Sequence, residues 1–323
     1  MVGLTGDGAS VLVLLGPTAC RKTAIALEVA RRLGGEIVSA DSRAFFVGLD
    51  VVTAKPSSAE RGLVPHHLVD CVPLRGTYDV MAFRADVARL VPEIAARGSV
   101  PMVVGGGTLY LGAILRGVFE GPGTNPSLRR SLRGVPVGDL HKRLADVDPA
   151  AATKIHGNDR LRIERALEVY EATGRAISEW QAQASPLPFR FVVLGLCRER
   201  EDHRRAIAER AEGMIAAGLL EEAARLRQDG LRTDDQAART IGVPEAWAVL
   251  DGTMPRDELP STLATTTWKL VRRQMSWFRR DAVAQWLCVS GRSVEDVAKE
   301  IVTAWNERTR GTPKDERSTN ASF

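Results

Sequence analysis

Short, uniformly apolar segments alternate with amphipathic segments along the first half of the chain. Residues 10–16 read SVLVLLG, an apolar run ending in glycine, which is typical of a buried parallel strand. Residues 22–35 then place Ile25, Val29 and Leu33 at helical spacing before a Gly-Gly stop. The pattern therefore predicts a strand followed directly by a helix.

The same alternation continues and indicates the fold class. Residues 80–98 have the pattern of a helix. Three further runs have the pattern of buried strands: 36–42, 100–107 and 190–200. Strands that alternate with helices predict an α/β fold with a parallel sheet. The ligand site of such a sheet lies beyond the carboxyl ends of its strands, where Gly16, Asp41 and Gly105 are found.

The pattern changes in the middle of the chain. From about residue 121 to 195 it is mainly helical in spacing and opens with a loop-like stretch. We therefore predict a helical insertion at 121–195 in an α/β core formed by 1–120 and 196–308, with more helices after residue 196. The tail 309–323 is polar and poor in bulky apolar residues, so we expect it to be disordered.

Composition adds only a few constraints. The chain of 323 residues is 44% hydrophobic and 26% charged, as globular proteins are, and its net charge of +4 mildly favours a polyanionic partner. The four cysteines are scattered without a CxxC pair, which predicts a reduced protein without a structural zinc site. Neither a signal peptide nor a membrane-spanning run is evident, so we expect a cytoplasmic protein with no membrane partner.

Residues 16–23, GPTACRKT, follow the first predicted strand. They match the P-loop pattern G-x-x-x-x-G-K-[ST] at Gly16, Lys22 and Thr23, but Arg21 stands where the pattern has glycine. A loop between strand and helix offers phosphate its backbone N–H groups and the helix dipole. A left-handed arginine costs about 1–2 kcal/mol, although its guanidinium could itself bind phosphate. We predict a phosphate site; an ordinary turn with surface Arg and Lys is the alternative.

Other segments carry candidate chemistry. Asp41 could accept a proton, hold a metal or cap a turn. Residues 105–111 (GGGTLYL) form a glycine turn near the same edge.

His66 and His67 would need another metal ligand, and none is spaced obviously, so a structural role is favoured. Residues 272–280 (RRQMSWFRR) alternate basic and aromatic side chains, which indicates a nucleic-acid contact, an amphipathic helix with buried aromatic residues, or both.

Together these motifs resemble those of the tRNA dimethylallyltransferases, the bacterial tRNA isopentenyltransferases, from about residue 10 to 290. GPTACRKT is similar to the family's GPTASGKT, and SADSRAFFVGLDVVTAKP is similar to SADSRQVYRGLDIGTAKP. PHHLVD, VVGGGTLYLGAIL and IHGNDRLRIERALEVYEATGRAIS resemble HHLID, VGGTGLYLRALL and IHPNDxQRIxRALEVYxxTGxxxS. GMIAAGLLEEAARL and RRQMSWFRRD match the C-terminal motifs. The resemblance implies a P-loop NTPase-like core with a helical insertion that grips the tRNA anticodon arm.

The resemblance also implies a reaction. A dimethylallyl group would pass from dimethylallyl diphosphate to N6 of the adenosine beside the anticodon, with release of diphosphate. The loop, Lys22 and Mg²⁺ held by Thr23 would neutralise phosphate charge. Asp41 would act as general base, with Thr18 and Lys22 as further catalytic residues. The adenine of the acceptor nucleotide would leave its stack to reach them.

The family's ligand contacts fall on two sets of residues in this sequence. The diphosphate would bind the loop: Gly16, Pro17, Thr18, Ala19, Cys20, Arg21, Lys22 and Thr23. The tRNA would contact two segments and one glycine: Asp41, Ser42, Arg43, Ala44, Gly107, Leu161, Arg162, Ile163, Glu164 and Arg165. Arg162 and Arg165 could bind phosphate or splay a base. The resemblance thus implies tRNA and dimethylallyl diphosphate as partners, and a monomer.

The sequence departs from the family pattern close to the implied chemistry. The positions that differ are Cys20, Arg21, Ala44, Gly107, Leu161 and Trp268, which stand for Ser, Gly, Gln, Thr, Gln and Arg. Two alternatives therefore stay open: prenyl transfer to another acceptor, such as a free adenine nucleotide or small metabolite, and RNA binding without catalysis. A P-loop kinase has no separate support in the sequence.

Overall fold

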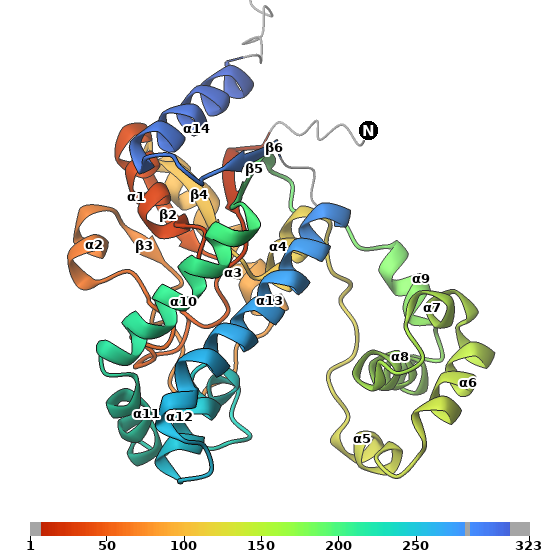
Figure 1. The fold of residues 1–323 in the computed structure, drawn as a ribbon. Coiled ribbons are helices and arrows are strands. Elements are labelled where there is room, and N and C mark those ends of the chain that lie inside the picture. Colours follow the sequence, from red (N-terminus) through yellow and green to blue (C-terminus); the bar gives the residue numbers. More distant parts are fainter. Residues whose placement is uncertain (1–7, 282–284, 311–323) are drawn as a thin grey trace, which may run out of the picture. The chain divides into compact units, whose positions relative to one another are not determined.

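The structure is a computed structural model that describes residues 8–281 and 285–310 (Figure 1). Its contacts divide the chain into two units. Residues 1–111 and 188–323 form an α/β core, and residues 112–187 form a helical unit. The predicted insertion ended at residue 195, but residues 190–195 pair in register with the first strand and so belong to the core.

A six-stranded parallel sheet forms the centre of the core (Figure 1). Its strands, in spatial order, are β3 (His66–His67), β2 (Gly35–Ser39), β4 (Val100–Gly105), β1 (Ser10–Leu15), β5 (Arg190–Cys197) and β6 (Gln285–Cys288). In the register of the central strands, Leu12 lies opposite Met102 on one side and Val192 on the other. The predicted α/β fold with a parallel sheet is confirmed, and the edge strands β3 and β6 extend it.

The central strands are buried on both faces, which explains their uniformly apolar sequence. Residues 11–15 of β1 are fully buried. One face packs against α1 (Lys22–Leu33) and α14 (Val294–Thr309) through an apolar cluster that includes Leu12, Ile25 and Ile301. Helix α3 (Val80–Ala96) contacts β2 and β4. This packing fixes the edge of the sheet at which β1, β2 and β4 end.

Helices that follow β5 complete the core. Helix α10 (Arg200–Ala216) packs along α13 (Leu259–Asp281), and α11 (Leu219–Gln228) packs on α12 (Val243–Leu250). The short elements are α2 (Ser58–Leu63), η1 (Ala237–Arg239) and η2 (Arg256–Glu258). Helix α4 (Thr108–Leu115) runs from the core into the helical unit. Within residues 8–281 and 285–310, no helix is long and apolar enough to cross a membrane.

The helical unit has an apolar core of its own. Its helices are α5 (Pro126–Leu132), α6 (Val137–Val147), α7 (Pro149–Lys154), α8 (Arg160–Thr173) and α9 (Ile177–Ala182). Leu140, Leu144 and Ile163 are buried at its centre. The Leu187 amide donates a hydrogen bond of 3.0 Å to the Ile114 carbonyl, so the two ends of the unit are tied together.

The C-terminal helix extends slightly beyond the predicted core. Helix α14 continues to Thr309, so that residue is not part of a polar tail. The remainder of the predicted tail, residues 311–323, lies outside the described residues.

Candidate active site

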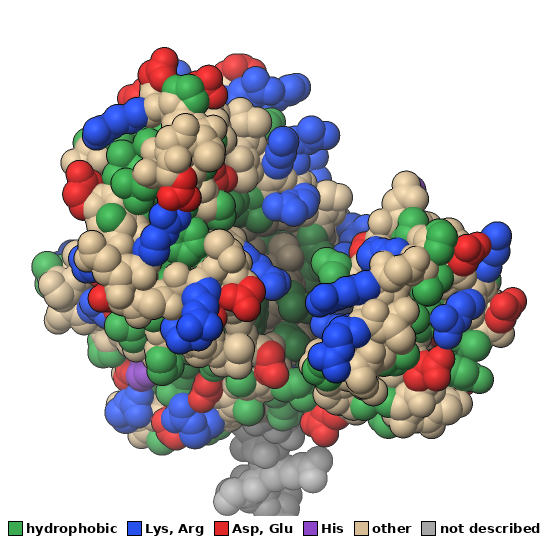
Figure 2. Space-filling model, turned by 90° about the horizontal axis from the view of Figure 1, so that it is seen from below, with side chains coloured by type: hydrophobic (Ala, Val, Ile, Leu, Met, Phe, Trp, Pro, Cys, Tyr) green, Lys and Arg blue, Asp and Glu red, His purple; other side chains and the backbone are tan. Residues whose placement is uncertain are grey.

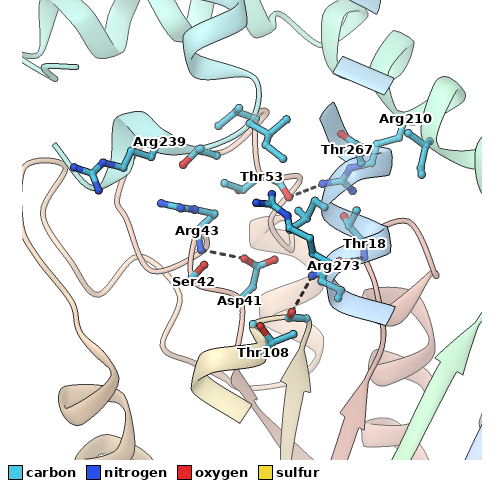
Figure 3. A pocket seen from close by; sticks show the side chains of 18 of the residues that line it. Thr18, Asp41, Ser42, Arg43, Thr53, Thr108, Arg210, Arg239, Thr267 and Arg273 are labelled. Carbon is cyan, nitrogen blue, oxygen red and sulfur yellow. Dashed lines mark hydrogen bonds between the residues drawn. The ribbon is translucent and has the colours of Figure 1, made fainter. Parts of the chain in front are cut away.

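The carboxyl ends of β1, β2 and β4 border a cavity of about 430 Å³ in the core (Figure 3). Loops that follow these strands form its wall together with α10, η1 and α13. Six charged side chains line it: Lys22, Asp41, Arg43, Arg210, Arg239 and Arg273. Because Asp41 is the one carboxylate among the described residues of this wall, the cavity is positively charged and suits an anion.

Asp41 lies in the turn that follows β2, and local hydrogen bonds fix its carboxylate. Its Oδ1 accepts a hydrogen bond from the Arg43 amide at 3.0 Å, and its own amide donates to Ser39 Oγ at 3.3 Å. The Ala44 amide donates to the Asp41 carbonyl and closes the turn. In the described structure no cation lies within ion-pair distance of the Asp41 carboxylate.

Two arginines of the cavity are held by backbone carbonyls. Arg43 Nη1 donates to the Gln236 carbonyl at 2.8 Å. Arg210 Nη2 donates to the Thr53 carbonyl at 2.8 Å (Figure 3). Burial lowers the pKa of both guanidinium groups, and the nearby Asp41 carboxylate acts in the opposite direction. One carboxylate cannot balance several cations, so an anionic ligand would stabilise them.

Sequence reasoning missed three of these arginines. Arg210, Arg239 and Arg273 come from α10, η1 and α13, in the second half of the chain. Arg273 lies in the basic segment 272–280, but the spacing of that segment does not show which arginine faces a ligand. Folding alone brings these side chains to the cavity that Thr18 and Lys22 also line.

The loop before α1 is hydrogen-bonded on both sides. The Thr18 amide donates to Gln274 Oε1 at 3.1 Å, and the Thr18 carbonyl accepts from His203 Nε2 at 2.8 Å. Gln274 Nε2 also donates to the Gly106 carbonyl at 2.8 Å, so one side chain connects this loop with the turn after β4. Burial lowers the pKa of Lys22, whose Nζ donates to the Pro17 carbonyl at 2.7 Å.

Thr18 and Lys22 are the predicted diphosphate residues that line the cavity. Six others do not line it: Gly16, Pro17, Ala19, Cys20, Arg21 and Thr23. A Cβ at position 16 would lie 2.6 Å from the Leu196 carbonyl oxygen, so only glycine fits there. Burial raises the pKa of the Cys20 thiol to about 11, so this substituted residue is a neutral thiol.

Arg21 has the left-handed conformation that the missing glycine would have, with φ 53° and ψ 24°. Its guanidinium donates to the carbonyls of Val289 and Arg292, in the turn after β6. This geometry weighs against the expectation that the guanidinium could bind phosphate, because its Nη2 already donates to two backbone carbonyls.

One of the departures from the family pattern has a local packing reason. Gly107 lines the cavity beside Ser42 and Arg43, and a Cβ there would lie 2.6 Å from the Ala40 carbonyl oxygen. The close approach of two backbone segments thus requires glycine. Ala44 is buried and lines a separate, smaller cavity of about 70 Å³.

The smaller cavity is where a metal ion would find oxygen ligands. Thr23 and Asp41 both line it, together with Lys22. The described ranges hold no group of three His, Cys, Asp or Glu side chains that could bind a metal by themselves. A hydroxyl and a carboxylate fit Mg²⁺ as part of a shell that phosphate oxygens and water complete, which is its usual mode of binding.

The histidine pair has hydrogen-bond partners that account for it structurally. His67 Nε2 lies 2.7 Å from Glu36 Oε2, and His66 Nδ1 lies 2.7 Å from the Val64 carbonyl oxygen. Both residues form the short strand β3 at the edge of the sheet. These contacts agree with the structural role that the sequence favoured.

The second predicted tRNA segment, residues 161–165, begins α8 in the helical unit. Leu161 is 78% exposed, which is unusual for a large apolar side chain, and Arg162 is also exposed. These two residues present an apolar and a cationic side chain to solvent.

The other residues of that segment are committed to the helical unit itself. Ile163 is fully buried, and Glu164 forms an ion pair of 2.8 Å with Arg160. Arg165 donates to Glu168 at 2.8 Å and to the Pro122 carbonyl at 2.7 Å. Their side chains therefore stabilise the fold around α8.

The basic segment 272–280 lies in the last turns of α13. Phe278 is fully buried, and Met275 and Trp277 are half-buried, as expected for an amphipathic helix. The segment borders a hollow of about 1010 Å³, here called the basic groove. Five arginines and no carboxylate line it among the described residues: Arg198, Arg200, Arg272, Arg279 and Arg280. The helix therefore joins an apolar packing face to a cationic surface.

Comparisons with known proteins agree with this architecture. A model of the IPP transferase family matches residues 44–281. The tRNA dimethylallyltransferases of Pelotomaculum thermopropionicum and Geobacter metallireducens are 39% and 41% identical, over 90% and 87% of this chain and 95% and 93% of theirs. The crystal structure of the full-length tRNA isopentenylpyrophosphate transferase from Bacillus halodurans matches with a TM-score of 0.69 and 31% identity, covering 93% of this chain and 98% of that one. The chain belongs to the IPP transferase family.

Proposed function

We propose that this protein transfers a dimethylallyl group from dimethylallyl diphosphate to N6 of the adenosine beside the anticodon of tRNA. The observation that carries the proposal is one cavity that holds Asp41 with Lys22 and four arginines at the carboxyl edge of the sheet. A proton acceptor and a cluster of cations are the groups that displacement of diphosphate by an amine needs. Relatives named tRNA dimethylallyltransferase support both substrates.

In this reaction adenine N6 attacks C1 of the dimethylallyl group while the bond from C1 to the diphosphate oxygen breaks. Diphosphate leaves with the bonding electrons, and the N6 proton passes to the Asp41 carboxylate. The hydrogen bond of 3.0 Å from the Arg43 amide orients that carboxylate before the acceptor arrives. Asp41 is thus the proposed general base.

The cations of the cavity would bind the diphosphate and stabilise the charge that develops as it leaves. Lys22 is a buried ammonium whose pKa burial lowers, and Pro17 offers it only a neutral carbonyl. A diphosphate oxygen would supply the missing negative charge and keep this ammonium protonated. Thr18, beside it in the wall, adds a hydroxyl that can donate to a phosphate oxygen.

Magnesium fits the proposed site as a ligand shared with the substrate. Thr23 would hold it, with phosphate oxygens and water completing the shell. When bound, the ion neutralises charge on the diphosphate.

The proposed acceptor is a base taken out of its stack, because N6 of a stacked adenosine cannot enter a cavity. Ser42, Arg43 and Gly107 line the cavity beside Asp41 and would contact that base. On the helical unit, exposed Leu161 and Arg162 suit an unstacked base and a backbone phosphate. We propose that this unit grips the anticodon arm and that the protein acts as a cytoplasmic monomer.

The decisive experiment is nucleoside mass spectrometry. The protein is incubated with dimethylallyl diphosphate, Mg²⁺ and unmodified tRNA, and the digested tRNA is compared with that from an active relative. We expect an isopentenyl mass on adenosine with tRNA and none with adenosine monophosphate. Absence of the tRNA product beside an active control enzyme would refute the proposal.

A further inference from the structure

Arg21 has a strained backbone at a position where the family pattern has glycine. Its φ of 53° and ψ of 24° are left-handed, and its side chain makes no capping bond to α1, which it precedes. Glycine adopts this conformation freely, whereas other residues keep it only when surrounding contacts hold them there. The contacts of Arg21 therefore show what this chain gains from the substitution.

The Arg21 guanidinium extends to the turn that joins β6 and α14, residues 289–292. Its Nη2 donates to the Val289 carbonyl at 2.7 Å and to the Arg292 carbonyl at 2.6 Å. Hydrogen bonds from a charged donor are stronger than neutral ones. The buried Nε of Arg21 has no hydrogen-bond partner in the described structure. The two hydrogen bonds that the guanidinium makes there both go to the turn.

The turn that receives Arg21 is itself anchored to the core. The Val289 amide donates to the Cys197 carbonyl at 2.8 Å, and Ser290 Oγ donates to Asp202 Oδ2 at 2.6 Å. These bonds tie the turn to β5 and α10. Helix α14, which follows the turn, packs along α1, which follows Arg21. Arg21 thus connects the phosphate loop to a fixed part of the core.

We propose that Arg21 is a positioning residue for diphosphate binding. Its bonds to the turn 289–292 hold residue 21 in the left-handed conformation, and thereby hold the amides of residues 16–23 in the arrangement that binds diphosphate. A glycine at this position would lose backbone conformational entropy when the ligand binds. The tethered arginine is already ordered in the ligand-free protein, so binding does not incur that cost. The inference rests on the proposed function and adds to it a residue that does not touch the substrate.

A direct phosphate contact by Arg21 is a different explanation, and the contacts weigh against it. Arg21 does not line the cavity that holds Lys22 and Asp41. Its Nη2 already donates two hydrogen bonds shorter than 3 Å to the turn 289–292. The tether and the contact also predict opposite behaviour of the loop in the ligand-free protein, which can be measured.

Four variants separate the tether from other effects. Arg21→Gly relieves the backbone strain and removes both bonds, and Arg21→Asn tolerates the left-handed region but cannot reach the turn. Arg21→Lys keeps the charge and one donor group, so it is the conservative rescue. Arg292→Ala is the matched control, because it removes a side chain of the same turn, paired with Glu300, and leaves the carbonyl that Arg21 uses.

Amide hydrogen exchange of Gly16 and of residues 18–23 in the ligand-free protein is the first measurement. We expect exchange about tenfold faster in Arg21→Gly and Arg21→Asn, an intermediate rate in Arg21→Lys, and no change in Arg292→Ala. The second is steady-state kinetics, in which Arg21→Gly should raise KM for dimethylallyl diphosphate about tenfold and change kcat less than about twofold.

Unchanged exchange in Arg21→Gly would overturn the proposal, and so would tighter diphosphate binding by that variant. A lower kcat at constant KM would also overturn it, because it would reflect less folded protein instead of a misplaced loop. If the wild-type protein transfers no dimethylallyl group to tRNA, the proposed function fails separately. Hydrogen exchange and titration with inorganic pyrophosphate then still decide whether Arg21 orders the loop.

Discussion

At the scale of single residues, the proposed mechanism assigns diphosphate binding to the cations of the cavity and proton transfer to its one described carboxylate. Burial lowers the pKa of Lys22 and of Arg210, so each gains from an anionic ligand. Asp41 is exposed and is held only through its own turn. Loss of a cation should therefore weaken diphosphate binding, and loss of the carboxylate should slow the chemical step.

Replacement of Asp41 by asparagine should lower kcat for transfer to tRNA by about 10²–10⁴-fold, because an amide cannot accept the N6 proton. KM for dimethylallyl diphosphate should change by no more than about threefold. Steady-state assays with labelled dimethylallyl diphosphate test this, with Asp229→Asn, an exposed residue after α11, as control. A kcat within tenfold of wild type would exclude Asp41 as the base.

Replacement of Gln274 by alanine should loosen the phosphate loop. The buried amide of Gln274 pairs with Thr18 N and Gly106 O, and its loss leaves both backbone groups unpaired. We expect the free energy of unfolding to fall by about 2–4 kcal/mol and diphosphate affinity to fall with it. Chemical denaturation and titration measure the two effects. The exposed Gln228→Ala should change neither, and a wild-type stability of Gln274→Ala would contradict the assignment.

The sequence carried part of this residue-scale picture. Asp41 and Lys22 could be predicted because each directly follows a strand or loop with a recognisable pattern. The left-handed backbone of Arg21 followed from the glycine that it replaces. The hydrogen-bond acceptors of the Arg21 guanidinium, the carbonyls of Val289 and Arg292, could not be predicted. Every residue has a backbone carbonyl, so the sequence does not indicate which distant one an arginine reaches.

At the scale of elements, one buried carboxylate connects β2, β3 and the end of α3. Glu36 accepts hydrogen bonds from Arg97 at 2.7 and 3.1 Å, and His67 Nε2 lies 2.7 Å from it. Arg97 first, and then His67, lower the pKa of Glu36 to about 2. These bonds fix the edge strand β3, which is too short to be held by its own pairing.

The pKa of Glu36 predicts a specific loss of stability in acid. Because the folded-state value of about 2 lies below the ordinary 4.5, its contribution is present above pH 4.5 and is lost as the pH falls toward 2. The shift corresponds to about 3 kcal/mol. Chemical denaturation from pH 7 to 2 should show a flatter pH profile for Glu36→Gln than for wild type. Identical profiles would refute this, and Glu212→Gln, an exposed residue of α10, is the control.

Elements with a single strong pattern were predictable, and short edge elements were not. The strands β1, β2, β4 and β5 are mainly apolar because helices cover both faces of the sheet. Strands β3 and β6 contain two and four residues, and most of their side chains are partly exposed. They therefore lack the apolar run from which a buried strand can be predicted. The boundary of the helical unit was misplaced because it was drawn inside the run of β5.

At the scale of the whole molecule, charge is balanced overall and concentrated locally. The sequence has 44 Lys and Arg against 40 Asp and Glu, and the face shown in Figure 2 intersperses basic and acidic side chains. The basic groove departs from this mixture, since arginines line it without a carboxylate among the described residues. An extended polyanion would be attracted there even though the net charge is small.

The salt dependence of tRNA binding tests whether the basic groove contacts the backbone. Arg279→Ala should reduce the slope of log K against log salt by about 1 and weaken binding similarly for all tRNA sequences. Binding isotherms at several salt concentrations provide the slope. Arg31→Ala removes an exposed arginine from α1, far from the groove in sequence, and should leave the slope unchanged. An unaltered slope in Arg279→Ala would exclude the contact.

The cavity itself is a property of the whole molecule and could not be predicted from any one segment. Its arginines come from a turn after β2, from α10, from η1 and from α13. Periodicity indicates which face of a helix is apolar, but not which cation of the polar face meets a loop from another part of the chain. Only the packing of α10 along α13 settles that choice.

The hydrogen bond between Leu187 and Ile114 has a consequence for protein engineering and for evolution. Because the helical unit begins and ends at one place, a short linker could replace it without stretching the core. The unit is then an exchangeable cassette: a core without it would keep the cavity that Lys22 and Asp41 line, because every residue of that wall belongs to the core.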